Sequence, residues 1–212
     1  MAIVWACALT VDEYLAAGRQ VEVPRVDCGD CGGPMTFRSG YHRDLRAEGG
    51  SCHRAWIARA ECSACAKTHA LLPSFLVAWR LDVAATIGKV IGAAVDAGLG
   101  VRRAVEGTTV PHTTARDWVR RFAARAPALA AGLASAAVAL GDDSFVPPRL
   151  AAARSALEAL RGAWRALMAR VGWRAPGLWA FATLVTGGTL VATARHPLSI
   201  FLGSRRLIPP AP

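Results

Sequence analysis

The spacing of apolar residues divides the chain into a strand-like first part and a helical remainder. Up to about residue 73, apolar residues alternate with polar ones or form short runs, which is typical of strands. After residue 80 they recur every three or four positions, as Val83, Ile87, Val90 and Ala94 do. We therefore expect a small β unit followed by helices.

Start and stop signals set the boundaries within the first part. Thr10 and Glu13 have the spacing of a capping box, and Gly18 supplies a stop, so a short helix is expected over 10–17. Alternation predicts a strand over 19–23. A β-ribbon is predicted from 35–37 and 53–59 around a turn at 46–51, followed by a last strand over 68–73.

The same signals predict the helices. Asp82 can cap a helix that ends at Gly98 and Gly100, and Pro111 can open a later one. The expected helices cover 82–97, 101–106, 111–125, 127–140, 150–171 and 178–185, with a loop over 141–148 and a strand over 189–193.

Two cysteine pairs dominate the candidate chemistry. Cys28 and Cys31 are separated by two residues, as are Cys62 and Cys65, and 30 residues lie between the pairs. Each pair can present two thiolates to one ion, so the four residues predict a closed tetrahedral zinc site of the structural kind. Other donors that can substitute are Cys7, Cys52, His53 and His69.

Oxidised cysteines are the alternative to a metal. Two disulfides require an oxidising compartment, and the first residues lack the basic region and long apolar core of an export signal. A thioredoxin-like redox pair is expected near a βαβ pattern, whereas these pairs flank a ribbon. We expect reduced, metal-bound cysteines and a cytoplasmic, nucleoid-associated protein.

Charge adds a second clue. Lysine and arginine number 25 against 15 acidic residues, and all but two of the basic residues are arginine. The excess lies after residue 80, where 16 basic residues face 7 acidic ones. The apolar stretch 178–194 is about 17 residues long, shorter than the ~20 that a membrane span needs. Nucleic acid is therefore a better candidate partner than a membrane.

The expected helix over 111–125 has an apolar side and a cationic side. At about 100° per residue, Trp118 and Phe122 share one side while Arg116 and Arg120 share the other. Guanidinium groups can bond guanine bidentately, so this face predicts DNA reading after a brief turn. The candidate DNA-binding residues are His112, Thr113, Arg116, Arg120, Arg121, Arg125, Arg102 and Arg103. The alternative is a solvated arginine face, with Asp117 paired to Arg121.

Three stretches carry a resemblance to known proteins: 28–35, 68–75 and 110–122. With them, the chain resembles a small bacterial family catalogued as a domain of unknown function, and the N-terminal region of insertion-sequence transposases. The resemblance covers roughly residues 3–125 and implies a zinc-ribbon domain over 1–75 and a homeodomain-like helix-turn-helix domain over 76–126. The residue pattern itself predicts a mostly helical region over 127–212, so the expected fold class is α+β. It implies Cys28, Cys31, Cys62 and Cys65 as metal ligands and the helix with Arg116 as the recognition helix.

The expected function is zinc-stabilised binding of double-stranded DNA without catalysis. A transposase core holds metal ions with acidic residues spread over strands, whereas residues 127–212 contain only Asp142, Asp143 and Glu158. The alternative is a zinc-ribbon interaction module whose C-terminal helices dock another protein. Burial of the Arg116 face against residues 127–212 would favour that alternative.

Overall fold

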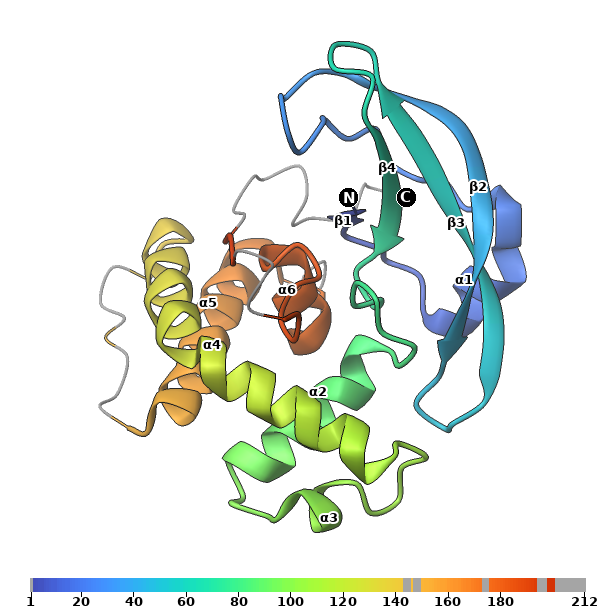
Figure 1. The fold of residues 1–212 in the computed structure, drawn as a ribbon. Helices are drawn as coiled ribbons and strands as arrows, with labels where there is room; N and C mark the ends of the chain where they lie inside the picture. The colour runs from blue at the N-terminus through green and yellow to red at the C-terminus, as the bar shows by residue number, and fades with distance from the viewer. Residues whose placement is uncertain (1, 143–145, 147–149, 173–175, 194–197, 201–212) are drawn as a thin grey trace.

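The fold is mixed α+β, as expected from the sequence: a four-stranded sheet comes first and helices follow. A computed structural model describes residues 2–142, 146, 150–172, 176–193 and 198–200. The sheet stands on one side of the protein with the first short helix beside it, and the later helices gather on the other side (Figure 1). The elements are β1 (Ala2–Trp5), α1 (Val11–Ala17), the 3-10 turn η1 (Gly18–Gln20), β2 (Met35–Arg46), β3 (Cys52–Cys62), β4 (Thr68–Pro73), α2 (Ala84–Val95), α3 (Val101–Ala104), α4 (His112–Ala139), α5 (Ala152–Val171) and α6 (Leu178–Val185).

The sheet has the order β1-β4-β3-β2. β2 and β3 form a long antiparallel hairpin, β4 returns antiparallel to β3, and β1 lies parallel to β4 with Ala2 opposite Ala70. The hairpin is longer than the ribbon predicted from the sequence. The expected strand over 19–23 is wrong, because the chain turns through η1 and then runs without regular structure. β1 takes an edge of the sheet instead.

Helix α1 forms as its signals predict. Thr10 and Glu13 make both hydrogen bonds of the capping box, and Gly18 ends the helix with φ +52°. Tyr14 on α1 is buried and its hydroxyl donates to the main-chain oxygen of Trp56 at 2.8 Å. The capping box therefore orients a helix that packs on β3.

Helix α4 is longer than expected, because it joins the two helices predicted over 111–125 and 127–140. A proline inside a helix removes one hydrogen bond and costs about 3 kcal/mol. Here the buried stripe of Trp118 and Phe122 continues through Leu129 and Leu133 on either side of Pro127. Burial of that continuous stripe outweighs the local cost of the proline.

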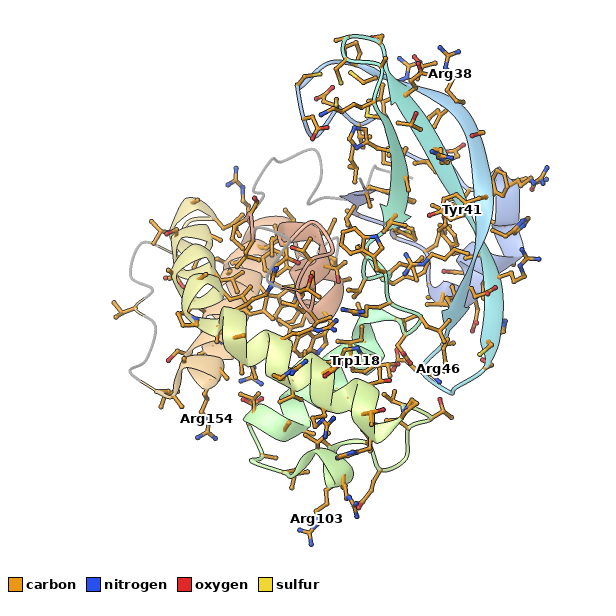
Figure 2. All side chains as sticks on the ribbon, in the orientation of Figure 1. Arg38, Tyr41, Arg46, Arg103, Trp118 and Arg154 are labelled. Carbon is orange, nitrogen blue, oxygen red and sulfur yellow. The ribbon has the colours of Figure 1, made fainter. Side chains whose placement is uncertain are left out.

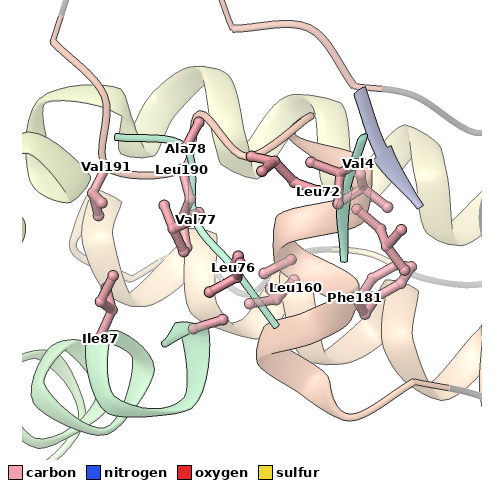
Figure 3. Close-up of a cluster of buried hydrophobic side chains, with 14 of the residues drawn as sticks. Val4, Leu72, Leu76, Val77, Ala78, Ile87, Leu160, Phe181, Leu190 and Val191 are labelled. Carbon is pink, nitrogen blue, oxygen red and sulfur yellow. The ribbon is translucent and has the colours of Figure 1, made fainter. Parts of the chain in front are cut away.

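The core is shared by the sheet and the helices. Figure 3 shows Val4 and Leu72 from the sheet near Phe181 of α6. Ile87 of α2 lies at the opposite side of the same cluster. The buried residues form one cluster that runs from Ile3 to Val191. The sheet and the helices are therefore held to one another by apolar packing.

Residues 186–193 turn back over this core. The expected strand over 189–193 is wrong: the chain makes turns here, bonded by Gly188 N to Thr183 O at 2.7 Å. The loop predicted over 141–148 lies largely outside the described residues.

One helix in the described part of the chain, α4, is long and apolar enough to span a bilayer by length and composition alone. Of the most apolar 18-residue stretch of α4, 39% is buried inside the protein. Helices in the core of a protein can be equally long and apolar, so this is weak evidence for a membrane span. The stretch 178–194, examined above for the same reason, contains only the eight-residue α6 as a helix among its described residues.

Candidate metal centre and candidate nucleic-acid interface

Four cysteine thiols meet at one end of the sheet. The Sγ atoms of Cys28, Cys31, Cys62 and Cys65 all lie within 4.8 Å of one another. Cys31 and Cys62 are 3.4 Å apart, and Cys28 and Cys65 are 3.8 Å apart. A zinc ion with ~2.3 Å bonds to tetrahedral sulfur separates its ligands by ~3.8 Å. The group can therefore hold a metal ion with little movement.

Glycine and main-chain amides shape the inner wall of this group. A Cβ on Gly33 would lie 2.8 Å from Cβ of Ala64 and 3.1 Å from Sγ of Cys62, so a side chain does not fit. Gly32 has φ +73°, which favours glycine. The amide of Asp30 points at Sγ of Cys28, at 3.4 Å. Such amides favour negatively charged sulfur, as metal-bound thiolates require.

The thiols differ in how readily they lose a proton. Hydrogen bonds from the amides of Cys65 and Ala64 lower the pKa of Cys62 to about 7, and the amide of Asp30 lowers that of Cys28. At Cys31 the amide of Gly33 acts in the same direction. The neighbouring sulfurs of Cys62 and Cys65 outweigh it and raise the pKa of Cys31 to about 12. Four thiolates this close need a cation to balance their charge.

His69, which the sequence offers only as a substitute donor, lies beside the four cysteines. Its Nε2 lies 3.4 Å from Sγ of Cys28, and the side chain is 1% exposed. Cys28, Asp30 and His69 also form a second group of donors close enough to share an ion. The pairing of β4 with β3 brings His69 there, opposite Ala60.

The other substitute donors lie elsewhere. Burial is the main reason that the pKa of Cys7 rises to about 11, and its thiol faces the main-chain oxygen of Leu9. Cys52 is exposed at the start of β3, and His53 Nε2 is 2.8 Å from the Ser51 hydroxyl. Within the described residues, neither group of metal donors includes them.

The first half of α4 has the two faces that its sequence predicts. Ala115, Trp118 and Phe122 are buried, each 1% exposed or less, whereas Arg116 and Arg120 are exposed. The arginine face therefore does not pack against the described residues after 126, and such packing is what would have favoured the interaction module. Figure 2 shows Trp118 on the α4 ribbon, near the centre of the protein (Figure 2).

Asp117 forms ion pairs with two of the arginines on α4. Its carboxylate lies 3.1 Å from Arg120 and 3.7 Å from Arg121, so the expected i,i+4 pair is present together with a second pair. Within the described part of the chain, Arg116 has no ion-pair partner. Arg116 is thus the arginine of this face that can meet a ligand without breaking a contact.

The remaining candidate positions surround this face. Arg102 and Arg103 are exposed on α3, and Arg103 projects away from the protein in Figure 2. Thr113 is exposed and His112 is half-buried in the first turn of α4. With Arg116 and Arg120 they form a surface from α3 to α4, which we call the arginine surface: Arg102, Arg103, His112, Thr113, Arg116 and Arg120.

Arg125 was predicted to bind DNA, but its side chain is buried. It is 9% exposed, and its guanidinium donates to the main-chain oxygens of Thr189 at 3.0 Å and Thr193 at 2.8 Å. Burial lowers its pKa. The residue holds the C-terminal turns against α4, so its expected phosphate contact is wrong.

A buried ion pair connects the β2–β3 hairpin to α2 and α4. Arg46 at the end of β2 bonds Asp82 twice, at 2.7 and 2.9 Å, and also donates to the main-chain oxygen of Thr109 at 3.2 Å. Asp82 therefore does not cap α2 as expected. Gly50 at the hairpin tip leaves room for Thr109, since a Cβ there would lie 2.4 Å from its methyl group. In Figure 2, Arg46 lies between the hairpin and α4.

The few acidic groups after residue 126 form no metal-binding group within the described residues. Glu158 pairs with Arg161 at 2.5 Å, and Arg161 also pairs with Asp96 at the end of α2. Asp143 lies outside the described residues. The pair of Arg161 with Asp96 joins α5 to the end of α2, whereas the pair with Glu158 lies within α5.

Part of the chain is similar to a known protein family. Residues 28–108 match the model of a family described as a domain of unknown function, DUF6431. The matched stretch contains the four clustered cysteines and His69 and ends before α4. Neither the curated proteins nor the solved structures gave a match. The expected likeness to a domain of unknown function is thus confirmed for this stretch, and the likeness to transposases stays a prediction.

Proposed function

We propose that this protein is a zinc-stabilised, non-catalytic DNA-binding protein. The cysteine group holds zinc, and α2, α3 and the first half of α4 act as a helix-turn-helix. The single observation that supports the DNA-binding part best is the exposed face of α4, with Arg116 and Arg120 outward and Trp118 buried behind them. Double-stranded DNA is the proposed partner, and the cytoplasm the proposed location.

Zinc suits the donor set better than a harder metal such as magnesium or calcium. Four thiolates in a tetrahedral arrangement are the usual ligands of structural zinc, whereas magnesium and calcium take oxygen ligands. Four protein ligands fill the tetrahedron, so the ion would contribute to folding rather than activate water. Its proposed role is to hold the end of the sheet from which the rest of the hairpin extends.

DNA suits the arginine surface because DNA offers arginine side chains two kinds of contact, to base edges and to phosphate oxygens. Arg116 and Arg120 are one helical turn apart on α4, so both can enter one groove and bond base edges. Arg102 and Arg103 on α3 are suited to phosphate oxygens, as residues flanking a reading helix commonly are. The buried Trp118 and Phe122 would hold the helix in place while it is engaged.

The absence of catalysis is part of the proposal. Phosphoryl transfer of the transposase kind needs carboxylates that together hold metal ions. Glu158 is paired with Arg161, which also pairs with Asp96 at the end of α2, and this supports a structural role for the C-terminal helices. Magnesium-dependent cleavage or joining of DNA by the purified protein would contradict this part.

Zinc analysis and DNA selection test the proposal together. Protein prepared without chelator should contain one zinc per chain, and should lose it with its folded structure when Cys62 and Cys65 are both changed to serine. The same preparation should select a duplex from a random pool. Arg116→Ala should weaken that binding about 5- to 150-fold, whereas Arg165→Ala, which removes an exposed arginine from α5, should bind as wild type does.

Two results would contradict the proposal. Zinc content near zero in folded protein would refute the metal assignment. Zinc-loaded, folded protein that binds no duplex at low salt would refute the DNA assignment, and the zinc-ribbon interaction module would then replace it.

A further inference from the structure

A histidine whose polar atoms are not used in packing lies behind the four cysteines. His69 is 1% exposed, and its Nδ1 has no hydrogen-bond partner among the residues that the structure describes. A buried polar atom without a partner lowers stability, so such a group calls for an explanation. The other ring nitrogen, Nε2, lies 3.4 Å from Sγ of Cys28. Neutral imidazole is a common metal ligand, and this one is already placed beside the sulfur group.

His69 belongs to a second group of donors, which shares one sulfur with the first. The donor atoms of Cys28, Asp30 and His69 all lie within 4.8 Å of one another. Lys67 pairs with Oδ2 of Asp30 at 2.9 Å, and a carboxylate has a second oxygen for an ion. Sγ of Cys65 lies 3.8 Å from that of Cys28. Two sulfurs, one nitrogen and one oxygen therefore make up a second set of four ligands, all of kinds that zinc accepts.

The two cysteines outside this second set are suited to oxidation. The Sγ atoms of Cys31 and Cys62 are 3.4 Å apart, and a disulfide needs them about 2.0 Å apart. Cys31 is exposed, whereas Cys28 and His69 are 3% and 1% exposed. Redox-sensing cysteines are commonly exposed and close to a second cysteine that resolves the oxidised sulfur. An oxidant that arrives from solvent therefore meets Cys31 before it meets the second set.

Hydrogen peroxide is an oxidant that completes this reaction without a further reagent. The Cys31 thiolate attacks one peroxide oxygen, so that an S–O bond forms, the O–O bond breaks and hydroxide leaves. The Cys62 thiolate then attacks the Cys31 sulfur, which forms the S–S bond, breaks the S–O bond and releases a second hydroxide. The two thiolates lose two electrons in all, and both hydroxides take up protons to become water.

We propose that zinc stays bound when peroxide joins Cys31 to Cys62. The disulfide removes two ligands, and the ion passes to the second set, which consists of Cys28, Cys65, His69 and Asp30. The end of the sheet then keeps its metal during oxidation, and reduction by a thiol restores the four-cysteine set. This inference rests on the proposed zinc at the four cysteines and adds how that site responds to an oxidant.

Peroxide treatment of zinc-loaded, full-length protein tests this directly. The zinc content of the untreated protein is measured first, a colorimetric chelator then reports zinc released during oxidation, and peptide mass mapping locates the disulfide. Wild type should form the Cys31–Cys62 disulfide and keep about one zinc per chain. His69→Phe, loaded in excess zinc, should form the same disulfide and release most of its zinc.

Two further variants support the test. Cys31→Ser Cys62→Ser removes both oxidisable sulfurs without peroxide and should still bind cobalt. Its sulfur-to-cobalt charge-transfer band should be about half as intense as that of wild type, because two of the four thiolates remain. Cys52→Ser removes an exposed cysteine that belongs to neither group of donors, and it should behave as wild type does throughout.

Release of zinc by wild type as the Cys31–Cys62 disulfide forms would overturn the inference, and so would oxidation that leaves Cys31 unpaired or joins Cys28 instead. It would also be overturned if His69→Phe kept its zinc after oxidation, or if the double-serine variant bound no cobalt. Each of these results leaves zinc in the untreated wild-type protein, which separates it from failure of the metal assignment. Folded, untreated wild type without zinc would overturn both.

Discussion

Replacing Arg46 with alanine should destabilise the protein more than replacing most surface residues does. The side chain of Arg46 is 15% exposed and that of Asp82 is 3% exposed, so their two hydrogen bonds at 2.7 and 2.9 Å are shielded from water. Loss of the arginine leaves a buried carboxylate without its counter-ion. Breaking a buried pair in this way costs about 3–5 kcal/mol.

Asp82→Asn should cost less, about 1–3 kcal/mol. The amide oxygen can still accept from Arg46, and the guanidinium keeps the main-chain oxygen of Thr109 as a partner. When both residues are changed to alanine, no charge remains buried. The double variant should therefore lose at least about 1 kcal/mol less than the sum of the two single alanine variants, because the residues form one network.

Urea unfolding in excess zinc, followed by circular dichroism, measures these free energies without confusing them with metal loss. Arg54→Ala is the matched control: its pair with Asp44 is loose, at 3.6 Å, and both side chains are 72% exposed. That control should change stability by less than about 1 kcal/mol. An Arg46→Ala protein as stable as the control, or strictly additive alanine variants, would refute the reasoning.

Four further predictions concern the metal site and the arginine surface. Gly33→Ala should weaken zinc binding about tenfold or more in a chelator competition, because its Cβ meets Cys62 and Ala64, whereas Gly29→Ala, with one contact at 3.9 Å, should not. His69→Phe should weaken it about 10- to 100-fold by removing the partner of the Cys28 sulfur, and unchanged affinity would exclude that role. Because the pKa of Cys31 is about 12 and that of Cys65 is raised, the metal-free site holds at least two protons near pH 7. Zinc affinity should then rise about 100-fold per pH unit, with proton release measurable by calorimetry in two buffers. Asp117→Asn should strengthen duplex binding a fewfold by freeing two arginines, and weaker binding would count against the arginine surface.

The features that the sequence predicts correctly depend on residues close together in the chain. The capping box of α1 spans four residues, and each cysteine pair spans four. The apolar side of α4 follows from helical spacing alone. In each case the interaction is decided within one or two turns of backbone, so the pattern contains all that is needed.

The features that the sequence did not predict depend on distant partners. β1 pairs with β4 across nearly 70 residues, and Arg125 is buried by carbonyl groups 64 and 68 residues away. The position of Arg125 in the helical pattern is like that of an exposed arginine. Its burial depends on residues 186–193, which turn back and place their main-chain oxygens at its guanidinium group. The sequence names His69 together with three other substitute donors, and only the pairing of β4 with β3 shows that His69 is the one beside the cysteines.

Titration of a selected duplex at two salt concentrations tests the central claim most directly. The account predicts that Arg116→Ala loses about 1–3 kcal/mol of binding free energy and relaxes the preference at one base position. Arg103→Ala should weaken all sequences alike and flatten the dependence of log K on log salt by about one unit, as loss of one phosphate contact does. If zinc-loaded Arg116→Ala and Arg120→Ala both bind the duplex as tightly as wild type, with the same sequence preference, then α4 does not read DNA and the account is contradicted.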